Sequence, residues 1–227
     1  MPFSQKSLDF LFENRLNDSR EWYNANKHIY KEHVTKPFTE LLNALAPTFE
    51  RIDPRLVCAP RCICRVNRDC RFSKDKSLYR DHIWFSVKPP KCYRPLPEFY
   101  FCIEQGGFSY GSGYYCMPKE TMDELREMII SGNKLYKNAK ESLENQDVFT
   151  LGGEMYKRNH YPDQSEEDCN WLNRKALYVN TFSTDKELLF SDKLADRLKE
   201  DFPKLEAFYR FVCAADAFAA EKKFHHM

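Results

Sequence analysis

The sequence predicts an α+β fold, in which helices at both ends of the chain pack on an antiparallel sheet of about five strands. Three observations predict it. Apolar residues recur at helical spacing over residues 4–52, their period changes to two after Leu56, and helical spacing returns after Pro118. The connections between consecutive middle strands are short, which favours antiparallel pairing. No repeat or linker divides the chain, so residues 1–227 are predicted to form a single α+β domain.

Three helices are predicted in the N-terminal part. Ser4 can cap the first helix, and Asp18 begins a capping pattern for the second. Pro37 suits the first turn of the third helix, whereas Pro47 predicts a kink or a break within it. The three apolar stripes are Leu8, Leu11, Phe12 and Leu16; Trp22, Ala25 and Ile29; and Phe38, Leu41, Leu42, Leu45, Phe49 and Ile52.

The middle of the chain predicts four strands. Residues 67–80 are charged and lack periodicity, so they are predicted to form a long loop. Gly106-Gly107 is predicted to turn the third strand into the fourth, and the proline-rich stretch 89–97 is predicted to be a connection. The predicted strands are residues 61–66, 82–87, 99–104 and 108–116.

The C-terminal part predicts helices and one more strand. The helical spacing of apolar residues marks the helices, and alternation marks the strand. The expected elements are a helix opened by Pro118, a helix over residues 134–145, an irregular segment over 152–163, a short helical piece beginning at Trp171-Leu172, a strand over 177–182, and a last helix that starts from a capping box at Thr184 and is broken near Pro203.

The overall charge excludes a general electrostatic attraction to nucleic acid or membranes. The chain has 35 basic and 34 acidic residues, a net charge of +1. The charge is unevenly distributed, because residues 61–80 hold seven basic and two acidic side chains. This stretch therefore carries +5 and the remainder of the chain −4, so any attraction to an anion must come from this one segment.

The sequence shows neither a transmembrane stretch nor a signal peptide, so no membrane partner is expected. Nine cysteines are many, but the odd count argues against a disulfide framework. We expect free thiols, several of them small core residues, and a cytoplasmic location. No metal is expected, because Cys58, Cys62, Cys64 and Cys70 lack paired C-x-x-C spacing. Cofactor and oligomeric state are left open.

The basic segment, residues 61–82, is the strongest compositional signal. Arg65, Arg68 and Arg71 lie three residues apart, across the end of a predicted strand and the start of the loop. A planar guanidinium donates two parallel hydrogen bonds to a phosphate or a carboxylate, so these arginines could hold an anion. The alternative is a solvated basic loop that protects a sheet edge, and composition alone favours it.

The stretch at residues 65–82 reads RVNRDCRFSKDKSLYRDH and resembles the central signature of the family called domain of unknown function 2461. The family carries no established activity, so the resemblance implies no reaction. This chain has Cys70 where the family has an apolar residue, and Leu78 where it has a proline. The resemblance covers nearly the whole chain and includes Arg20-Glu21-Trp22-Tyr23, Gly111-Ser112-Gly113, Gly153-Glu154 with Lys157-Arg158, and Trp171-Leu172 with Lys175.

Because the basic segment belongs to a recognisable signature, we expect it to bind a ligand rather than only to protect an edge. The expected ligand is an anionic small molecule that bears a phosphate or a carboxylate, held in a pocket; whether catalysis follows is left open. The predicted ligand-binding residues are Arg65, Arg68, Asp69, Arg71, Lys74, Lys76, Tyr79 and His82, with Lys157 and Arg158 opposite them, and with Glu104 and Glu154 as carboxylates that pair with arginines or act as bases.

Two other functions stay open. The chain could be a nucleic-acid-binding module, in which Phe72, Tyr79 and Trp84 stack on bases, although its near-neutral charge argues against this. It could also be a non-catalytic domain, whose arginines form an internal salt-bridge network that ties the loop to the sheet.

Overall fold

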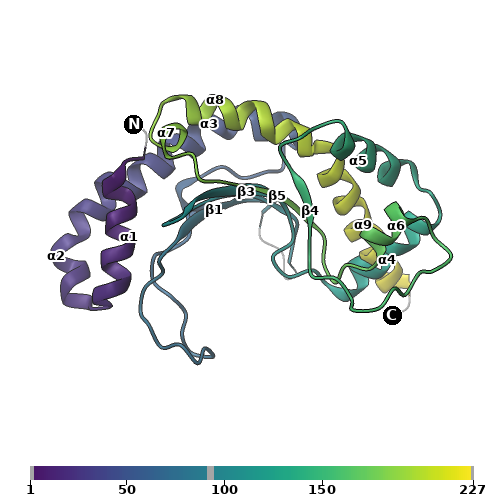
Figure 1. Cartoon of the computed structure of the whole chain (residues 1–227), viewed down its shortest axis with the longest axis horizontal. Helices are drawn as coiled ribbons and strands as arrows, with labels where there is room; N and C mark the ends of the chain where they lie inside the picture. The colour runs from purple at the N-terminus through teal and green to yellow at the C-terminus, as the bar shows by residue number, and fades with distance from the viewer. Residues whose placement is uncertain (1–2, 91–94, 226–227) are drawn as a thin grey trace. The chain divides into compact units, whose positions relative to one another are not determined.

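The computed structural model describes residues 3–90 and 95–225, so part of the predicted connection 89–97 lies outside the described residues. Helices precede and follow the strands, which confirms the predicted α+β class (Figure 1). The elements are α1 (Gln5–Asn17), α2 (Arg20–Tyr30), the π-helical turn η1 (Lys31–Thr35), α3 (Lys36–Ile52), the 3-10 turn η2 (Pro60–Cys62), β1 (Ile83–Val87), β2 (Glu98–Glu104), β3 (Gly107–Gly113), α4 (Lys119–Ile130), α5 (Lys134–Glu144), β4 (Thr150–Gly152), α6 (Glu166–Leu172), β5 (Tyr178–Ser183), α7 (Lys186–Leu189), α8 (Lys193–Asp201), the 3-10 turn η3 (Phe202–Leu205) and α9 (Glu206–His225).

The strands form one antiparallel five-stranded sheet in the order β1-β2-β3-β5-β4. Leu151 of β4 pairs with Val179 of β5. Of the predicted strands, the four that correspond to β1, β2, β3 and β5 are present, although β3 ends at Gly113 rather than near Cys116. The short strand β4 lies in a stretch for which the sequence predicts no strand.

The predicted strand over residues 61–66 is wrong. Pro60–Cys62 form a 3-10 turn, consistent with the fixed φ of proline and its missing N–H donor. Beyond this turn, the chain makes only isolated antiparallel bridges, from Ile63 to Phe85 and from Asn67 to Tyr79. The two bridges are two residues out of register with each other, so no continuous ladder joins them.

The chain comprises two compact units. The first consists of Met1–Val87, Tyr100–Tyr110 and Phe182–Glu200, and the second consists of Lys88–Phe99, Gly111–Thr181 and Asp201–Met227. Strands β2, β3 and β5 contribute residues to both units. That residues 1–227 form a single domain stays a prediction.

The core of the first unit is built from aromatic rings between the helices and the sheet. Phe101 of β2 lies 5.8 Å from Phe85 of β1 and 6.0 Å from Phe38 of α3, measured between ring centroids. Helices α3 and α8 lie on the same side of these strands (Figure 1). Helix α3 continues through Pro47, so the predicted break is not found.

The buried face of α1 differs from the predicted stripe. Ser4 precedes the helix as predicted, and its N–H donates to Ser7 Oγ at 3.0 Å. Leu8 and Leu11 are buried, but Phe12 and Leu16 are exposed. The buried face instead includes Ser7, Phe10 and Asn14. Helical spacing identifies a helix, but the neighbouring elements decide which of its faces is covered.

The second helix begins one residue later than its predicted cap. Ser19 Oγ accepts a hydrogen bond from Trp22 N, whereas Asp18 ends α1 in the left-handed conformation, with φ of 45°. Within Arg20–Tyr30, all described, no residue is buried: Trp22 and Ile29 are half-buried and Ala25 is exposed, contrary to the prediction. The aromatic residues of α2 contact α1 from the surface, since the Trp22 ring lies 5.7 Å from that of Phe10.

In the second unit, α9 packs against α4 and α5. The ring of Phe99 lies 4.9 Å from Tyr209 of α9 and 5.8 Å from Phe202 of η3. The predicted helices after Pro118 and over 134–145 correspond to α4 and α5. Trp171 and Leu172 end α6, whereas the prediction has them begin it.

The predicted last helix is divided into α7, α8, η3 and α9. Asp185, not Thr184, caps α7, because its carboxylate accepts a hydrogen bond from Leu188 N at 2.9 Å. The predicted break near Pro203 is confirmed, since Pro203 lies in the 3-10 turn η3. Among the described helices, none has both the length and the apolar character needed to cross a membrane.

Candidate functional site

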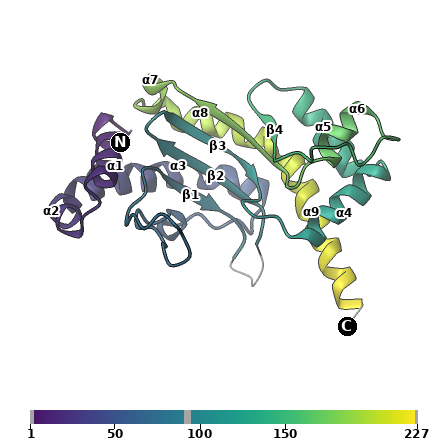
Figure 2. The same ribbon diagram turned by 60° about the horizontal axis from the view of Figure 1, so that its bottom comes forward.

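The basic segment forms an arm, defined here as residues 63–82, that leaves η2 and returns to β1. Backbone hydrogen bonds join its two sides, from Arg68 N to Leu78 O at 2.8 Å and from Arg80 N to Val66 O at 2.9 Å. The tip over residues 69–77 follows beyond these bonds and reaches away from the sheet (Figure 1). In Figure 2, where the bottom of Figure 1 comes forward, the arm lies beside β1.

Asp75 holds the tip of the arm together through hydrogen bonds and ion pairs. Its carboxylate accepts hydrogen bonds from Ser77 N at 3.0 Å and from the Ser77 hydroxyl, and it forms ion pairs with Arg68 and with Arg15 of α1. The bonds from Ser77 and Arg68 hold the pKa of Asp75 well below its usual range. Arg68, a predicted ligand-binding residue, is therefore paired within the arm and links its tip to α1.

A second ion pair lies at the exposed tip. Arg71 donates from Nε to Asp69 Oδ1 at 2.9 Å and from Nη2 to Asp69 Oδ2 at 2.6 Å. This two-fold contact lowers the pKa of Asp69 to about 2. Both side chains are more than half exposed, at 77% and 57%, so water competes with the contact. Lys76 Nζ donates to the backbone carbonyl of Cys70 at 3.0 Å.

The return side of the arm is anchored on the first two helices. The Asp18 carboxylate accepts hydrogen bonds from Leu78 N at 2.7 Å and from Tyr79 N at 3.2 Å. The Tyr79 ring is buried and stacks on Tyr23 of α2, with centroids 5.2 Å apart. Burial raises the pKa of Tyr79 above its ordinary value. Tyr79, a predicted site residue, thus serves packing in this structure.

Four cations of the arm form no ion pair with an acidic residue in the part of the chain that the structure describes. Arg65, Lys74 and Lys76 are exposed, and Arg80 is half-buried. Arg80 Nε is buried and has no hydrogen-bond partner, while its guanidinium carbon lies 5.0 Å from the centroid of the Trp84 ring. An indole face offsets part of a cation's charge but provides no acceptor for its N–H groups.

His82 lies against the same indole. Its ring stacks on Trp84, with centroids 5.5 Å apart and an interplanar angle of 19°. His82 Nδ1 lies 2.7 Å from Asp81 Oδ1, and this hydrogen bond lowers the pKa of Asp81. The foot of the arm, defined as Arg80, Asp81, His82 and Trp84, therefore combines an unpaired guanidinium with an oriented imidazole.

The remaining predicted site residues are distributed over both units. Glu104 ends β2 in the first unit, and it forms no ion pair with any described arginine of the arm. Glu154, Lys157 and Arg158 belong to the second unit, where Glu154 pairs with Lys175. Lys157 and Arg158 are exposed. That they lie opposite the basic segment stays a prediction.

The glycine at the start of this second signature stretch has a structural role. Gly153 adopts φ of +122°, and a Cβ atom there would lie 2.0 Å from the backbone oxygen of Ala176. The Arg174 guanidinium donates to Gly153 O at 2.8 Å, and Lys175 N donates to Glu154 O at 2.8 Å. These contacts fasten residues 153–156 to the segment that follows α6.

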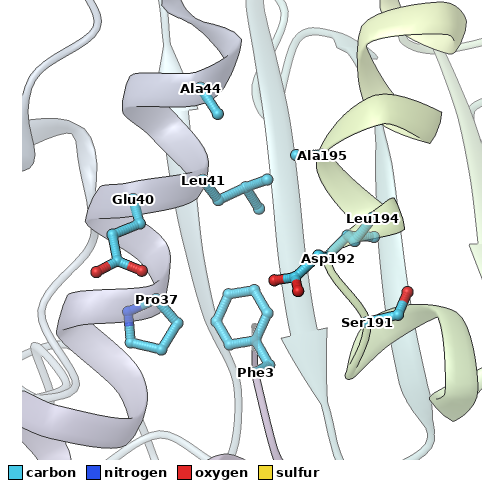
Figure 3. A pocket seen from close by; sticks show the side chains of 9 residues that line it. All are labelled: Phe3, Pro37, Glu40, Leu41, Ala44, Ser191, Asp192, Leu194 and Ala195. Carbon is cyan, nitrogen blue, oxygen red and sulfur yellow. The ribbon is translucent and has the colours of Figure 1, made fainter. Parts of the chain in front are cut away.

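A pocket of about 230 Å³ lies in the first unit, between α3 and the start of α8. Figure 3 shows Phe3 and Leu41 between the two helices, with the carboxylate of Asp192 beside Phe3 and that of Glu40 on α3 next to Pro37. None of the predicted ligand-binding residues lines this pocket. The pocket predicted at the basic segment stays a prediction.

Among residues 3–90 and 95–225, no group of three or more His, Cys, Asp and Glu side chains is placed to hold a metal ion. All eight described cysteines are half-buried or exposed, contrary to the prediction that several belong to the core. Burial raises the pKa of Cys58 and of Cys102 to about 12, which disfavours a reactive thiolate at either position.

Arg80 is the residue that the sequence interpretation did not single out. It is one of the seven basic residues of the segment, but it follows the signature's run of regularly spaced arginines. Its spacing of four from Trp84 was the available signal. That signal is weak, because Arg80 is distinguished by its buried Nε and its contact with the Trp84 ring, which only the structure shows.

A comparison with the curated proteins found no match. The family model described as "Conserved hypothetical protein (DUF2461)" matches residues 6–211. The matched range includes α1 except its first residue, the whole arm, the sheet and most of the helices that follow it. With its signature arginines, glycines and tryptophan in the positions described above, the chain belongs to the DUF2461 family.

Proposed function

We propose that the arm binds a small molecule bearing a phosphate or a carboxylate, and that Arg80 is its principal contact. The observation that carries this proposal is the state of Arg80, whose Nε is buried without an acceptor and whose charge has no acidic partner among the described residues. An unsatisfied buried donor costs about 1–3 kcal/mol, and more when it is charged. An oxyanion at the foot of the arm would pair with the charge of this guanidinium.

The charges around Arg80 favour the same ligand. Arg65 and Lys74 are exposed and unpaired among the described residues, so they raise the positive potential around the arm. Arg68 and Arg71 have a different role, because their guanidinium groups already contact Asp75 and Asp69. Arg68 and Arg71 therefore stabilise the arm itself, whereas Arg65 and Lys74 attract the ligand.

Isothermal titration with phosphate, sulfate and citrate tests this function on wild type, Arg80→Gln and Arg61→Gln. Arg61 is the matched control, since it is an exposed arginine of the same segment without a described acidic partner. We expect Arg80→Gln to weaken anion binding at least tenfold, which corresponds to about 1.4 kcal/mol. Arg61→Gln should change it less than threefold. Equal losses in the two variants, or no binding to wild type, would contradict the proposal.

A second candidate function is binding of single-stranded nucleic acid, and one observation favours it. The Phe72 side chain at the tip is 96% exposed, and the Arg71 guanidinium lies 5.8 Å from its ring centroid. An exposed ring beside cations can stack on a base while the cations contact phosphates. The net charge of +1 for the whole chain argues against strong non-specific binding.

Fluorescence anisotropy with a labelled oligonucleotide distinguishes the two candidates. If the tip binds single strands, affinity falls with increasing salt, and Phe72→Ala weakens it by about 1–3 kcal/mol. If the foot binds a small anion, Phe72→Ala leaves phosphate titration unchanged. Should no anion bind and Arg80→Gln only lower stability, the arginines of the arm serve structure alone.

A further inference from the structure

Arg80 and His82 share one aromatic surface. The Arg80 guanidinium carbon lies 5.0 Å from the centroid of the Trp84 ring, and the His82 ring stacks on the same indole at 5.5 Å. The guanidinium and the imidazole are two residues apart in the chain and both lie against one indole, so an anion that contacts both groups would bind beside Trp84.

Asp81 determines which nitrogen of His82 carries the hydrogen. An ionised carboxylate only accepts hydrogen bonds, so Nδ1, at 2.7 Å from Asp81 Oδ1, must be the donor. In the neutral imidazole, Nε2 then has a lone pair and can only accept. A fully ionised anion facing Nε2 has no hydrogen to offer, whereas an anion that retains an O–H group can donate it.

We propose that His82 makes the site selective for an oxyanion that carries a proton, such as hydrogen phosphate, over a fully ionised one, such as sulfate. Neutral His82 accepts the ligand's O–H at Nε2, while Arg80 pairs with the ligand's charged oxygens. In the protonated imidazole Nε2 is a donor instead, and that form binds sulfate as well. This inference rests on the proposed anion-binding function and specifies its ligand.

The charges near this pair come from several elements. Arg80 and Asp81 belong to the same segment as His82, and Asp81 interacts with the charges of Arg15 of α1 and Arg68 of the arm. From β2, Cys102 interacts with Asp81, Glu104 and Cys64. Since the two arginines favour the ionised form of Asp81, its carboxylate keeps its accepting role through the pH range in which imidazoles titrate.

Titration calorimetry with inorganic phosphate and with sodium sulfate tests the inference at about pH 8, and at a lower pH at which nuclear magnetic resonance shows that His82 is protonated. At the higher pH, inorganic phosphate retains one O–H group and sulfate none. Wild type should bind phosphate about tenfold more tightly than sulfate at the higher pH, and the two within about threefold at the lower pH. Arg80→Gln should weaken both anions at both pH values.

Substitutions at the histidine provide the matched comparison. His82→Phe keeps a ring on Trp84 but removes both nitrogens, so it should bind the two anions equally at the higher pH. His160→Phe is the control, because His160 also stacks on an aromatic ring, that of Tyr156 at 4.6 Å, but lies in the second unit. It should retain the wild-type preference.

The results of these titrations distinguish the role of His82 from the proposed anion binding itself. If wild type binds phosphate and sulfate equally at the higher pH, or if His82→Phe retains the preference, the role of His82 is refuted and the proposed function stands. If wild type binds neither anion at either pH, the proposed function itself is refuted, and the inference with it. Circular dichroism of each variant establishes that a lost preference is not a loss of folding.

Discussion

Asp18 and Tyr79 are joined by a hydrogen bond between elements that are 61 residues apart in the chain. The Asp18 carboxylate accepts from Tyr79 N at 3.2 Å and from Leu78 N at 2.7 Å. Asp18 can do so because it ends α1 with φ of 45°, a left-handed conformation that aspartate and asparagine tolerate better than most residues. The end of one helix thus satisfies two backbone donors of the arm.

Replacement of Asp18 should loosen the arm. Asp18→Ala removes the acceptor of two N–H groups and places alanine in a left-handed conformation, so we expect a loss of about 2–3 kcal/mol in the free energy of unfolding. Asp18→Asn keeps an acceptor oxygen and tolerates the backbone, so it should lose about 1 kcal/mol or less. Urea denaturation measures both. Equal losses would mean that the side-chain acceptor is unimportant.

The Tyr79 ring should matter more than its hydroxyl. The side chain is 2% exposed and stacks on Tyr23, so Tyr79→Ala should cost about 3–5 kcal/mol through the cavity and the lost ring contact. Tyr79→Phe keeps the ring and should stay within about 1 kcal/mol of wild type. Thermal and chemical denaturation provide the measurement. A large loss in Tyr79→Phe would reveal a hydroxyl contact that outweighs the packing.

The two ion pairs of the arm should contribute unequally to its order. Arg68 is 21% exposed and shares Asp75 with Arg15, whereas Arg71 is 77% exposed and contacts only the nearby Asp69. Arg68→Ala should therefore increase the rate of tryptic cleavage within residues 69–77 severalfold, while Arg71→Ala leaves cleavage at the remaining basic residues close to wild type. Limited proteolysis with mass spectrometry measures the cleavage rate of each variant. The reverse order would contradict this assignment.

Acid should release the tip of the arm. The folded-state pKa values of Asp75 and Asp69 are depressed, so both carboxylates stabilise the folded arm above the ordinary aspartate pKa of about 4. That contribution is lost as the pH falls through the folded values, which for Asp69 is about 2. We expect the amide signals of Ser77 and Arg71, which donate to these carboxylates, to titrate well below the ordinary aspartate value of about pH 4.

Nuclear magnetic resonance of the two amides measures this titration directly. In Asp75→Asn, the Ser77 amide should no longer respond, because the titrating group is absent. The Arg71 amide should keep its response and serve as the internal control. A midpoint near pH 4 for wild-type Ser77 would show that its hydrogen bonds do not depress the carboxylate.

In the second unit, Gly153 should tolerate no side chain. A Cβ there would lie 2.0 Å from Ala176 O, and φ of +122° is unfavourable for L-residues, so Gly153→Ala should cost more than about 2 kcal/mol. Gly132→Ala is the control: φ is +63°, and the nearest atom is Lys137 Cε at 3.4 Å, so about 1 kcal/mol is expected. Denaturation curves of the two variants give the two losses in the free energy of unfolding. Similar losses would imply that the backbone near Ala176 moves freely.

Local patterns predicted most elements of the fold. The stripe of α3 and the alternation in β1, β2 and β5 are present where the sequence places them, because a helix face and a pleated strand each impose a fixed spacing. Residues 61–66 also alternate, but they form no strand, because no partner strand lies in register with them. Phe12 and Leu16 belong to the predicted apolar stripe of α1, but they are exposed because no neighbouring element covers them.

The candidate site was predictable as a segment but not as a set of contacts. Charge and signature identify residues 61–82, yet nothing in the sequence indicates that Arg68 pairs with Asp75 while Arg80 has no acidic partner among the described residues. Arg68 and Asp75 are seven positions apart, so their ion pair depends on the backbone conformation of the tip between them. The second partner of Asp75, Arg15, comes from α1, sixty residues away.

By itself, the sequence determined the α+β class, the position of most helices and strands, and the basic stretch at residues 61–80 with its net charge of +5. These follow from local spacing and from composition, which do not depend on distant residues. Only the tertiary structure decided that Asp18 anchors the arm, that Asp75 and Asp69 occupy Arg68 and Arg71, and that Arg80 lies on Trp84 beside His82. Such contacts join residues from separate elements, and only packing brings those together.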